Sequence, residues 1–391
     1  MKGHIYKRGK TYTYVIDLGK DPITNKRQQK TKGGFKTKKE AEAALAKIQT
    51  EYNEGTYINQ SEITFKEFVD KWMELYKKTG VKENTVLKRV HETGVMLDYF
   101  KEAKLQNIST PIYQDFLLSL SDKFAESTIR KINITGGMVF RKAIELKYIR
   151  ENPTEYAVIP KKPKTLEESM QEDIPKYFEK DELQEFLECA KKDTNIQSYY
   201  IYLTLAYTGM RIGELCALQW KDIDFDNKTI KIYKNYFNAK NKVTEYKLTT
   251  TKSESSKRLI VIDDFLIAAL KKHRAWQSQL ILLTGDTWYK KDFVFTKSLR
   301  YAGYPETPNQ IEKKMDLIIE KNNIKKKLTP HNLRHTHTSL LAQAGVSLEE
   351  IMERLGHKND TVTRNIYLHI TKDMKKDASQ KFGELMKNIN C

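Results

Sequence analysis

Six side chains that could bind a phosphate, transfer a proton or act as a nucleophile lie in short motifs of the second half of the chain. They are Arg211 in TGMRIGEL, Lys252 in TKSESSKR, His331 and Arg334 in HNLRH, His357 in LGH, and Tyr367 in NIYLH. Guanidinium groups bind two phosphate oxygens at once, imidazole transfers protons near neutral pH, and a tyrosine hydroxyl can form a covalent bond to phosphorus. These residue types together suit the transfer of a phosphoryl group.

Arg211 lies three residues before Glu214 at the predicted start of a helix, so the two side chains are expected to lie side by side. An isolated pair of this kind is most often only a structural ion pair. Lys252 lies in a polar connection between strands predicted over 229–233 and 257–262. On a mobile hairpin tip this lysine is either simply solvated or able to swing in as a proton donor.

A predicted helix start positions two of the histidines and the second arginine. Thr329 is the expected N-cap, and Pro330 occupies the first helical position. His331, Arg334 and His335 then share one face of the helix. The N-terminus of a helix also favours a bound phosphate.

Two later helices position the last two candidates. A capping box predicts a helix over 347–355, which a glycine ends directly before His357. The next short helix is expected to turn Val362 and Ile366 inward, with Tyr367 beside them and pointing elsewhere. Tyr367 is one of 22 tyrosines, so it carries meaning only together with the other motifs.

The order and spacing of these motifs resemble the signature of the tyrosine recombinase family. Six matching positions in one order are far harder to obtain by chance than any one of them. Before residue 179 the chain resembles, by pattern alone, the arm-binding and core-binding domains of integrases from temperate phages and integrative conjugative elements. The resemblance implies site-specific DNA recombination, with integration and excision of a mobile element through a 3′-phosphotyrosine intermediate on Tyr367.

The resemblance also gives each candidate a role that suits its chemistry. Five-coordinate phosphorus gathers charge on its nonbridging oxygens, which Arg211 and Arg334 would neutralise. Free tyrosine has a pKa of about 10, so the nucleophile needs activation, and His331 is the expected base. The resemblance implies that Lys252 donates a proton to the leaving 5′ oxygen and that His357 donates a hydrogen bond to the phosphate. Glu214 would orient Arg211.

No motif in the sequence predicts a cofactor. P-loop spacing, an HExxH motif and an acidic cluster suited to two-metal nuclease chemistry are all absent. A metal site is an alternative, because histidines are present at positions 331, 335, 337, 357 and 369. However, no thiol or carboxylate accompanies them at ligand spacing. Because a phosphotyrosine conserves the energy of the broken bond, rejoining is expected to need neither ATP nor metal.

The elements that must position these residues predict a multi-domain, mainly α fold with small β-sheets. Alternating residues from Tyr12 to Leu18 and a basic segment from Lys26 to Lys30 predict a three-stranded N-terminal sheet. A capping box from Thr37 to Glu40 begins a helix whose apolar face packs on that sheet. This arm-type DNA-binding domain is expected to cover residues 1–58.

Three further segments follow the N-terminal module. A capping box at Thr64 and helical periodicity to about residue 149 predict a SAM-like bundle of four or five helices, the core-binding domain of residues 63–160. A proline-stiffened basic segment begins a linker over 161–178, and a mixed α/β catalytic domain covers 179–391. Its amphipathic C-terminal helix, from Met374 to Leu385, packs in cis or, as the resemblance implies, on a neighbouring protomer.

The charge of the chain favours a polyanionic partner. The net charge is +18, the pI is about 9.4, and residues 1–60 carry 13 Lys or Arg against 6 Asp or Glu. Double-stranded DNA, with core and arm sites, is therefore the expected partner. Basic side chains that either contact this DNA or only solvate the outer surface are Lys26, Arg27, Lys30, Arg89, Arg130, Lys131, Lys161 and Lys162.

The same composition argues against other classes of protein. No apolar run approaches the ~20 residues that span a bilayer, and the N-terminus does not resemble a signal peptide. Cys189, Cys216 and Cys391 lack CxxC spacing, so neither a disulfide framework nor a zinc site is expected. We expect a cytoplasmic bacterial protein that works at the nucleoid as a tetramer on DNA, with an excisionase or a DNA-bending protein as accessory partner.

Two other functions agree with part of the sequence. A type IB topoisomerase-like enzyme shares the tyrosine chemistry, but the basic N-terminal module favours recombination. A non-catalytic DNA-binding regulator suits the charge and the helices equally well. Only the two kinds of enzyme form a covalent bond to DNA, so the formation of this bond distinguishes them from the regulator.

Overall fold

The computed structural model describes residues 3–20, 25, 27–53, 63–161, 176–251, 256–356 and 361–371. The chain forms two compact units, residues 1–165 and 166–391. In the described parts, no helix is both long and apolar enough to cross a membrane. The sequence-predicted features that lie outside the described residues are Lys26, Lys162, Lys252, His357 and the helix from Met374 to Leu385.

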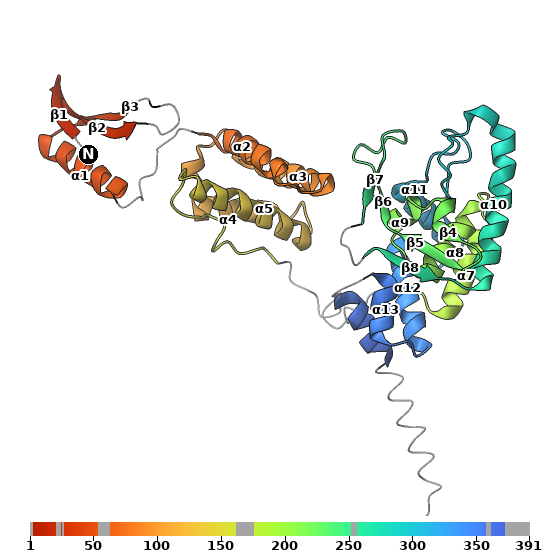
Figure 1. Cartoon of the computed structure of the whole chain (residues 1–391). Coiled ribbons are helices and arrows are strands. Elements are labelled where there is room, and N and C mark those ends of the chain that lie inside the picture. The colour runs from red at the N-terminus through yellow and green to blue at the C-terminus, as the bar shows by residue number, and fades with distance from the viewer. Residues whose placement is uncertain are drawn as a thin grey trace, which may run out of the picture. The chain divides into compact units, whose positions relative to one another are not determined.

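The N-terminal module of the first unit is an antiparallel three-stranded sheet with one helix packed on it (Figure 1). Its elements are β1 (Gly3–Arg8), β2 (Thr11–Lys20), β3 (Arg27–Phe35) and α1 (Lys38–Asn53). Tyr14 and Ile16 of β2 form a small core with Leu45 of α1. The Glu40 amide donates to Thr37 Oγ1 at 3.2 Å, which is the predicted cap of α1. The predicted sheet and helix are confirmed.

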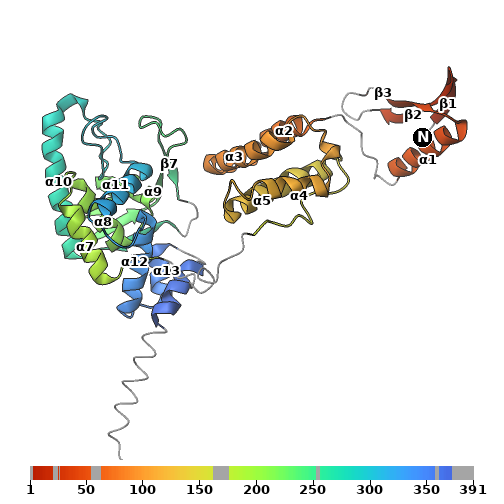
Figure 2. The same ribbon diagram turned by 180° about the vertical axis from the view of Figure 1, so that it is seen from behind.

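Residues 63–161 contain the predicted helical bundle. Its described elements are α2 (Phe65–Lys78), α3 (Glu83–Phe100), the 3-10 turn η1 (Leu105–Asn107), α4 (Thr110–Ser119) and α5 (Glu126–Glu145). Thr64 caps α2 in the predicted capping box with Glu67. The inner faces of the helices meet in a core rich in aromatic rings, in which Phe100 contacts Phe65 and Phe116 with ring centroids 5.2 and 5.0 Å apart. Figures 1 and 2 show α2 and α3 lying beside α4 and α5.

The second unit contains the mixed α/β part of the chain, and its central element is α8. Its elements are α7 (Lys180–Lys191), α8 (Gln197–Thr208), α9 (Ile212–Cys216), β4 (Ile223–Asp224), β5 (Thr229–Ile232), β6 (Lys234–Phe237), β7 (Lys247–Thr250), β8 (Arg258–Val261), α10 (Asp264–Thr284), α11 (Pro308–Lys321), α12 (Pro330–Gln343) and α13 (Leu348–Leu355). Residues 361–371 are also helical. All residues from Ile201 to Ala206 are buried, as expected for a helix that is apolar on every side. Helices α7, α10 and α12 contact α8, and α10 runs along the outer edge of the unit (Figures 1 and 2).

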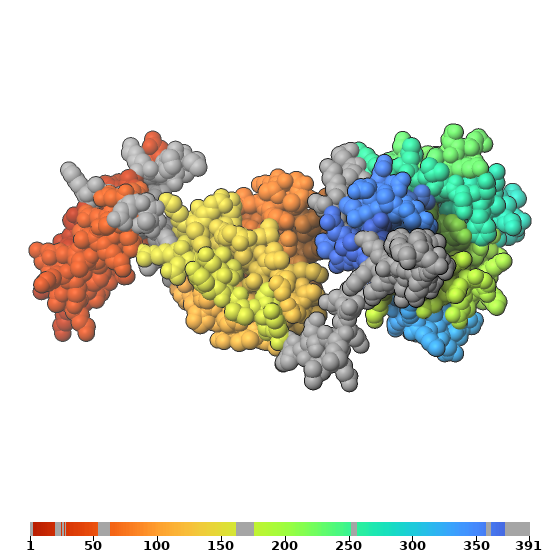
Figure 3. All heavy atoms as spheres, turned by 90° about the horizontal axis from the view of Figure 1, so that it is seen from below, coloured from red at the N-terminus to blue at the C-terminus, as the bar shows by residue number. Residues whose placement is uncertain are grey.

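A small antiparallel sheet in the order β4-β5-β8 packs against the helices of this unit. Ile230 pairs with Ile260 across β5 and β8, and both side chains are fully buried. Their neighbours Lys231 and Leu259 face outward, so each strand alternates as the sequence predicted. The space-filling view shows the blue residues of the C-terminal part of the unit packed beside its green and teal residues (Figure 3).

A second hairpin, β6–β7, interrupts the connection between β5 and β8 and was not predicted. Lys234 pairs with Thr250 and Phe237 pairs with Lys247. Aromatic stacking stabilises this hairpin, because the rings of Tyr236 and Tyr246 lie 5.6 Å apart. The two predicted strands pair with each other, as β5 and β8. The prediction was wrong only about their connection, which contains a complete hairpin before Lys252.

Candidate active site

The TGMR motif forms a turn that only glycine fits. Helix α8 ends at Gly209 in the left-handed conformation, with φ of 61°. A Cβ atom at this position would lie 2.6 Å from Cδ2 of His337 and 2.7 Å from Cδ2 of Leu355. The turn therefore packs directly against α12 and α13, and it positions Arg211 at the start of α9.

Arg211 is held by Glu214, as its spacing predicted. Nη1 of Arg211 lies 2.9 Å from Oε1 of Glu214, and the Arg211 amide donates to Oε2 at 3.0 Å. The Glu214 side chain is only 2% exposed, whereas 35% of the Arg211 side chain is exposed. One side of the guanidinium group is thus fixed inside the protein, while the remainder can contact an anion from outside.

A third arginine, Arg258, binds the same carboxylate and was missed in the sequence. Its Nη2 atom lies 3.0 Å from Oε2 of Glu214, its Nε donates to the carbonyl of Arg354 at 2.7 Å, and its Nη1 donates to the carbonyl of Ser256 at 3.1 Å. Burial opposes ionisation of Glu214, but Arg258 and then Arg211 hold the pKa of this carboxyl below its usual value. The carboxylate therefore stays charged and able to orient Arg211.

Arg334 connects the turn that carries Arg211 to the end of α13. Its Nη1 donates to the carbonyl of Gly209, and its Nη2 donates to the carbonyl of Leu355, both at 2.6 Å. Arg334 is only 3% exposed. Two of the predicted arginines thus lie at one place in the fold, although their motifs are more than 120 residues apart in the chain.

The carbonyl groups at the end of α13 are capped by arginines. Ser347 and Glu350 form the predicted capping box at the start of this helix, and Gly356 ends it with φ of 70°. The carbonyls of Arg354 and Leu355 accept from Arg258 and Arg334, respectively. Cations are favoured at this end of a helix because its unpaired carbonyls carry partial negative charge.

Helix α12 carries three histidines that differ in their surroundings. Its predicted start at Thr329 and Pro330 is confirmed. His331 is exposed and His335 is half-buried, and their rings meet edge to face with centroids 4.9 Å apart. The exposed position of His331 is compatible with its predicted role as a base, which stays a prediction.

His337 is a buried structural group. Its Nε2 accepts from Nε of Arg354 at 3.1 Å, so its Nδ1 must carry the proton that is donated to the carbonyl of Ala206 at 2.8 Å. Burial, with the charge of Arg354 second, lowers the pKa of His337 to about 3. Among the described residues, no group of three His, Cys, Asp or Glu side chains could hold a metal ion.

Tyr367 lies on the helix of residues 361–371 and is half-buried. It packs against a small core that contains Leu355 and Ile366. The inward face of this helix was partly mispredicted, because Val362 is 39% exposed whereas Thr363 is buried. Thr363 lies three residues before Ile366, and this spacing shares a helix face as readily as the spacing of four that favoured Val362.

The structure therefore brings together the described members of the predicted site in part. Arg211, Glu214 and Arg334 are connected through hydrogen bonds, and Tyr367 packs against the core that contains Leu355, whose carbonyl binds Arg334. The two arginines supply the kind of cationic groups that bind a phosphate.

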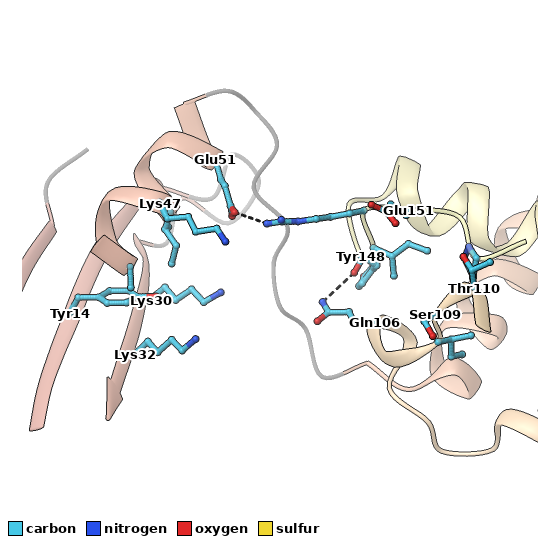
Figure 4. A pocket seen from close by; sticks show the side chains of 16 residues that line it. Tyr14, Lys30, Lys32, Lys47, Glu51, Gln106, Ser109, Thr110, Tyr148 and Glu151 are labelled. Atoms are coloured by element: carbon cyan, nitrogen blue, oxygen red, sulfur yellow. Dashed lines mark hydrogen bonds and ion pairs between the residues drawn. The ribbon is translucent and has the colours of Figure 1, made fainter. Parts of the chain in front are cut away.

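Most of the described basic side chains predicted to contact DNA are exposed, but some have protein partners. Arg27 forms an ion pair with Asp17 at 2.6 Å, and Arg130 forms one with Glu126 at 2.7 Å. Lys131 and Lys161 are exposed. In the N-terminal module, Lys30 extends its amine to the same side as Lys32 and Lys47 (Figure 4), which gives three positive charges on one surface.

Arg89 differs from the other basic candidates because it is engaged inside the bundle. Its Nη1 lies 2.6 Å from Oε2 of Glu92 and 2.6 Å from Oγ1 of Thr135. The Glu92 residue is only 7% exposed. This geometry favours a structural role for Arg89 over contact with DNA.

Models of known protein families match most of the chain. The phage integrase family matches residues 176–374, an arm DNA-binding domain matches residues 4–52, and the N-terminal SAM-like domain of phage integrases matches residues 64–121. The integrase of Staphylococcus phage L54a is 30% identical over 351 residues, which are 87% of this chain and 98% of the phage protein. The ICEBs1 integrase of Bacillus subtilis is 24% identical over 383 residues, 96% of this chain and 97% of that protein.

Solved structures have the same fold. The Tn1549 transposon integrase in complex with a circular intermediate DNA has a TM-score of 0.64 and 22% identity, and the match covers 82% of this chain and 99% of that chain. A lambda integrase tetramer bound to a Holliday junction has a TM-score of 0.57 and 17% identity, with 93% and 94% covered. The chain belongs to the phage integrase family of tyrosine recombinases, enzymes of site-specific DNA recombination.

Proposed function

We propose that this recombinase integrates and excises a mobile element by cutting and rejoining DNA through a covalent bond to Tyr367. The observation that carries the proposal is the pair of hydrogen bonds from Arg334 to the carbonyls of Gly209 and Leu355. These bonds join the turn before Arg211 to the helix beside which Tyr367 packs. A phosphate held by both arginines would then lie near the tyrosine.

In the cleavage step, Oη of Tyr367 attacks the phosphorus while His331 accepts the phenolic proton. A bond forms between the tyrosine oxygen and phosphorus, and the bond from phosphorus to the 5′ oxygen breaks. Lys252 gives a proton to this leaving oxygen. Arg211 and Arg334 neutralise the charge on the nonbridging oxygens.

Rejoining follows the same steps in reverse. The 5′ hydroxyl of the partner strand attacks the phosphotyrosine and releases the tyrosine hydroxyl. His357 donates a hydrogen bond to the phosphate in both directions, and Glu214 keeps Arg211 oriented. Because one phosphodiester is exchanged for another, the reaction consumes neither ATP nor metal.

The proposed partner is double-stranded DNA. The helical bundle and the catalytic unit bind a core site, and the N-terminal module binds an arm site through a surface that includes Lys30. The net charge of +18 supports this assignment. The DNA in the solved Tn1549 and lambda complexes agrees with it.

Exchange of strands between two sites requires four active sites, so we assign a homotetramer on DNA. The tetrameric lambda integrase is consistent with this assembly. An excisionase or a DNA-bending protein would set the direction of the reaction. The place of action is then the nucleoid of a bacterial cell that carries a phage or a conjugative element.

A nicked suicide duplex tests this proposal. The duplex carries the core site recovered from the joined ends of the element, and the nick lets the fragment beyond the cut diffuse away. The wild-type protein is expected to form a covalent adduct that denaturing electrophoresis resolves, and Tyr367→Phe is expected to form none. Tyr236→Phe, which changes a buried tyrosine of the β6–β7 hairpin, is the matched control and should form the adduct.

Three outcomes, from this assay and from a parallel plasmid assay, would contradict the proposal. An adduct with Tyr367→Phe would mean that another residue is the nucleophile. Relaxation of supercoiled plasmid without the site, and without strand exchange, would indicate a topoisomerase-like enzyme. Tight DNA binding with no adduct from the wild type would indicate a regulator.

A further inference from the structure

A closed circuit of contacts joins the two arginines that are proposed to bind the phosphate. Arg211 binds Glu214, which binds Arg258. Arg258 donates to the carbonyl of Arg354, and Arg334 donates to the carbonyl of the next residue, Leu355. Arg334 also donates to the carbonyl of Gly209, two residues before Arg211, and this bond completes the circuit.

Within this circuit, Arg258 is the residue that connects the Arg211 side to α13. Its guanidinium group reaches a carboxylate at 3.0 Å and a helix-end carbonyl at 2.7 Å in one fixed fork. A lysine ammonium presents its donors from a single point, so it cannot hold both acceptors in this geometry. The Arg258 side chain is only 5% exposed, so it lies beneath the surface of the protein.

We propose that Arg258 is a positioning residue that sets the spacing between Arg211 and Arg334. Both arginines are connected to consecutive carbonyls at the end of α13. Arg334 binds its carbonyl directly, whereas Arg211 is connected through Glu214 and Arg258. The circuit of contacts thereby fixes the two guanidinium groups relative to one another. This inference rests on the proposed function, because it assumes that Arg211 and Arg334 bind the scissile phosphate.

The alternative is that Arg258 only stabilises the fold. Its removal would then lower stability, and any loss of activity would follow the loss of folded protein. A positioning role predicts a different result, because the folded variant would bind DNA normally and cleave it slowly. Misplacement of a reacting group by about 1 Å can cost ~100-fold in rate.

The first test measures cleavage and binding separately with Arg258→Lys. The probe is the nicked suicide duplex, with protein in excess so that one turnover is observed. We expect adduct formation at least about tenfold slower than wild type, with the dissociation constant for the duplex within about twofold. Arg274→Lys, which changes an exposed arginine stacked on Trp220, is the matched control and should leave both unchanged. An unchanged rate for Arg258→Lys would overturn the proposal.

The second test asks whether Arg258 acts through Glu214. In a double-mutant cycle of Arg258→Lys and Glu214→Gln, the double variant should cleave no more slowly than the slower single variant, because both changes break the same circuit. If the loss of rate in the double variant equals the product of the losses in the two single variants, the two residues act independently and the proposal is overturned. If Tyr367→Phe still forms an adduct, the named nucleophile is wrong, but the rates of the Arg258 variants still test the positioning role.

The third test uses pH and the neutral variant Arg258→Met. Without Arg258 the burial of Glu214 is opposed mainly by Arg211, so the pKa of the carboxyl rises. Protonated Glu214 no longer forms an ion pair with Arg211. The cleavage rate of Arg258→Met, relative to wild type, should therefore fall as the pH is lowered from about 8 to about 6. A ratio that stays constant with pH would indicate a structural role only.

Discussion

Gly209 packs so closely against His337 that a Cβ atom added to the glycine would lie 2.6 Å from Cδ2 of the imidazole. The glycine also has φ of 61°, so alanine at this position meets both backbone strain and a clash. This contact holds the turn that carries Arg211 against α12. The glycine of the TGMR motif is therefore required by close packing as well as by the conformation of the turn.

The first prediction concerns Gly209→Ala. We expect the free energy of unfolding of the catalytic unit to fall by about 3 kcal/mol, from left-handed strain and overpacking together. Gly345→Ala is the matched control, because Gly345 has φ of 83° and no atom within 4 Å of an added Cβ. It should cost only about 1 kcal/mol. Equal losses for the two variants in urea unfolding would show that the contact with His337 is unimportant.

The second prediction concerns Arg334→Lys. Lysine can reach only one of the carbonyls of Gly209 and Leu355, and it cannot bind two phosphate oxygens as a fork. Single-turnover cleavage is expected to fall about 100-fold, which corresponds to about 3 kcal/mol of transition-state stabilisation. DNA affinity, measured by electrophoretic mobility shift, should change little. A variant that cleaves at the wild-type rate would contradict the role of Arg334.

Local signals in the sequence predicted local structure well. The caps at Thr37, Thr64, Thr329 and Ser347 all begin helices, and Gly356 ends α13. Each of these signals depends on residues within four positions of one another, which a single sequence displays directly. The pair of Arg211 and Glu214 was predictable for the same reason.

Features that depend on distant contacts could not be predicted. Arg258 bonds to Glu214, 44 residues away, and to the carbonyl of Arg354, 96 residues away. Arg258 is the last residue of the TKSESSKR motif and the first of β8, and there it resembles any basic residue at the start of a strand. The hairpin β6–β7 was missed because Tyr236 packs on Tyr246, and Tyr246 on Phe293, only after the chain has folded. The order of the motifs could identify the family, but not the circuit that holds its arginines.

The third prediction concerns stability at acid pH. Burial lowers the pKa of His337 to about 3 and that of His273 to about 4, so the unfolded chain binds protons that the folded chain excludes. Stability is therefore fully present above the unfolded pKa of about 6.5 and is lost as the pH falls toward the folded values. Each histidine should cost about 2 kcal/mol between pH 7 and pH 5. Urea unfolding at the two pH values measures this loss.

The control for this prediction compares two histidines of the same helix. His337→Gln keeps an acceptor for Arg354 and a donor for Ala206, and it should remove about 2 kcal/mol of the pH dependence. His331→Gln changes an exposed histidine and should leave the pH dependence intact. A loss of pH dependence in His331→Gln alone would show that the buried histidines are not its source.

The fourth prediction concerns the buried cluster of Arg89, Glu92 and Thr135. Glu92→Ala leaves the partly buried Arg89 charge without its ion-pair partner, and it should destabilise the bundle by about 2 kcal/mol. Arg89→Met combined with Glu92→Leu should recover most of this loss, with DNA affinity unchanged. Arg130→Met, which breaks an exposed pair with Glu126, should cost less than about 1 kcal/mol. Weaker DNA binding by the Arg89 double variant would show that Arg89 contacts DNA after all.

The last prediction separates the N-terminal module from the rest of the enzyme. The module has its own small core of Tyr14, Ile16 and Leu45, so deletion of residues 1–58 should leave the catalytic unit folded. The truncated protein should still form the adduct on a core site but fail to recombine sites that carry arm sequences. The full-length protein with Lys30, Lys32 and Lys47 changed to alanine should show the same defect, because these amines extend to one side of the module (Figure 4).

This second variant leaves the core of Tyr14, Ile16 and Leu45 unchanged, so it distinguishes a lost DNA contact from a lost domain. Thermal unfolding should show no change, while the affinity for arm DNA should fall and its dependence on salt should weaken, since fewer phosphates are neutralised. Lys38→Ala is the matched control, because Lys38 is exposed at the start of α1 and close to Glu42. Normal recombination by both the truncated protein and the triple variant would mean that the module does not bind arm DNA, and its basic surface would then only solvate the fold.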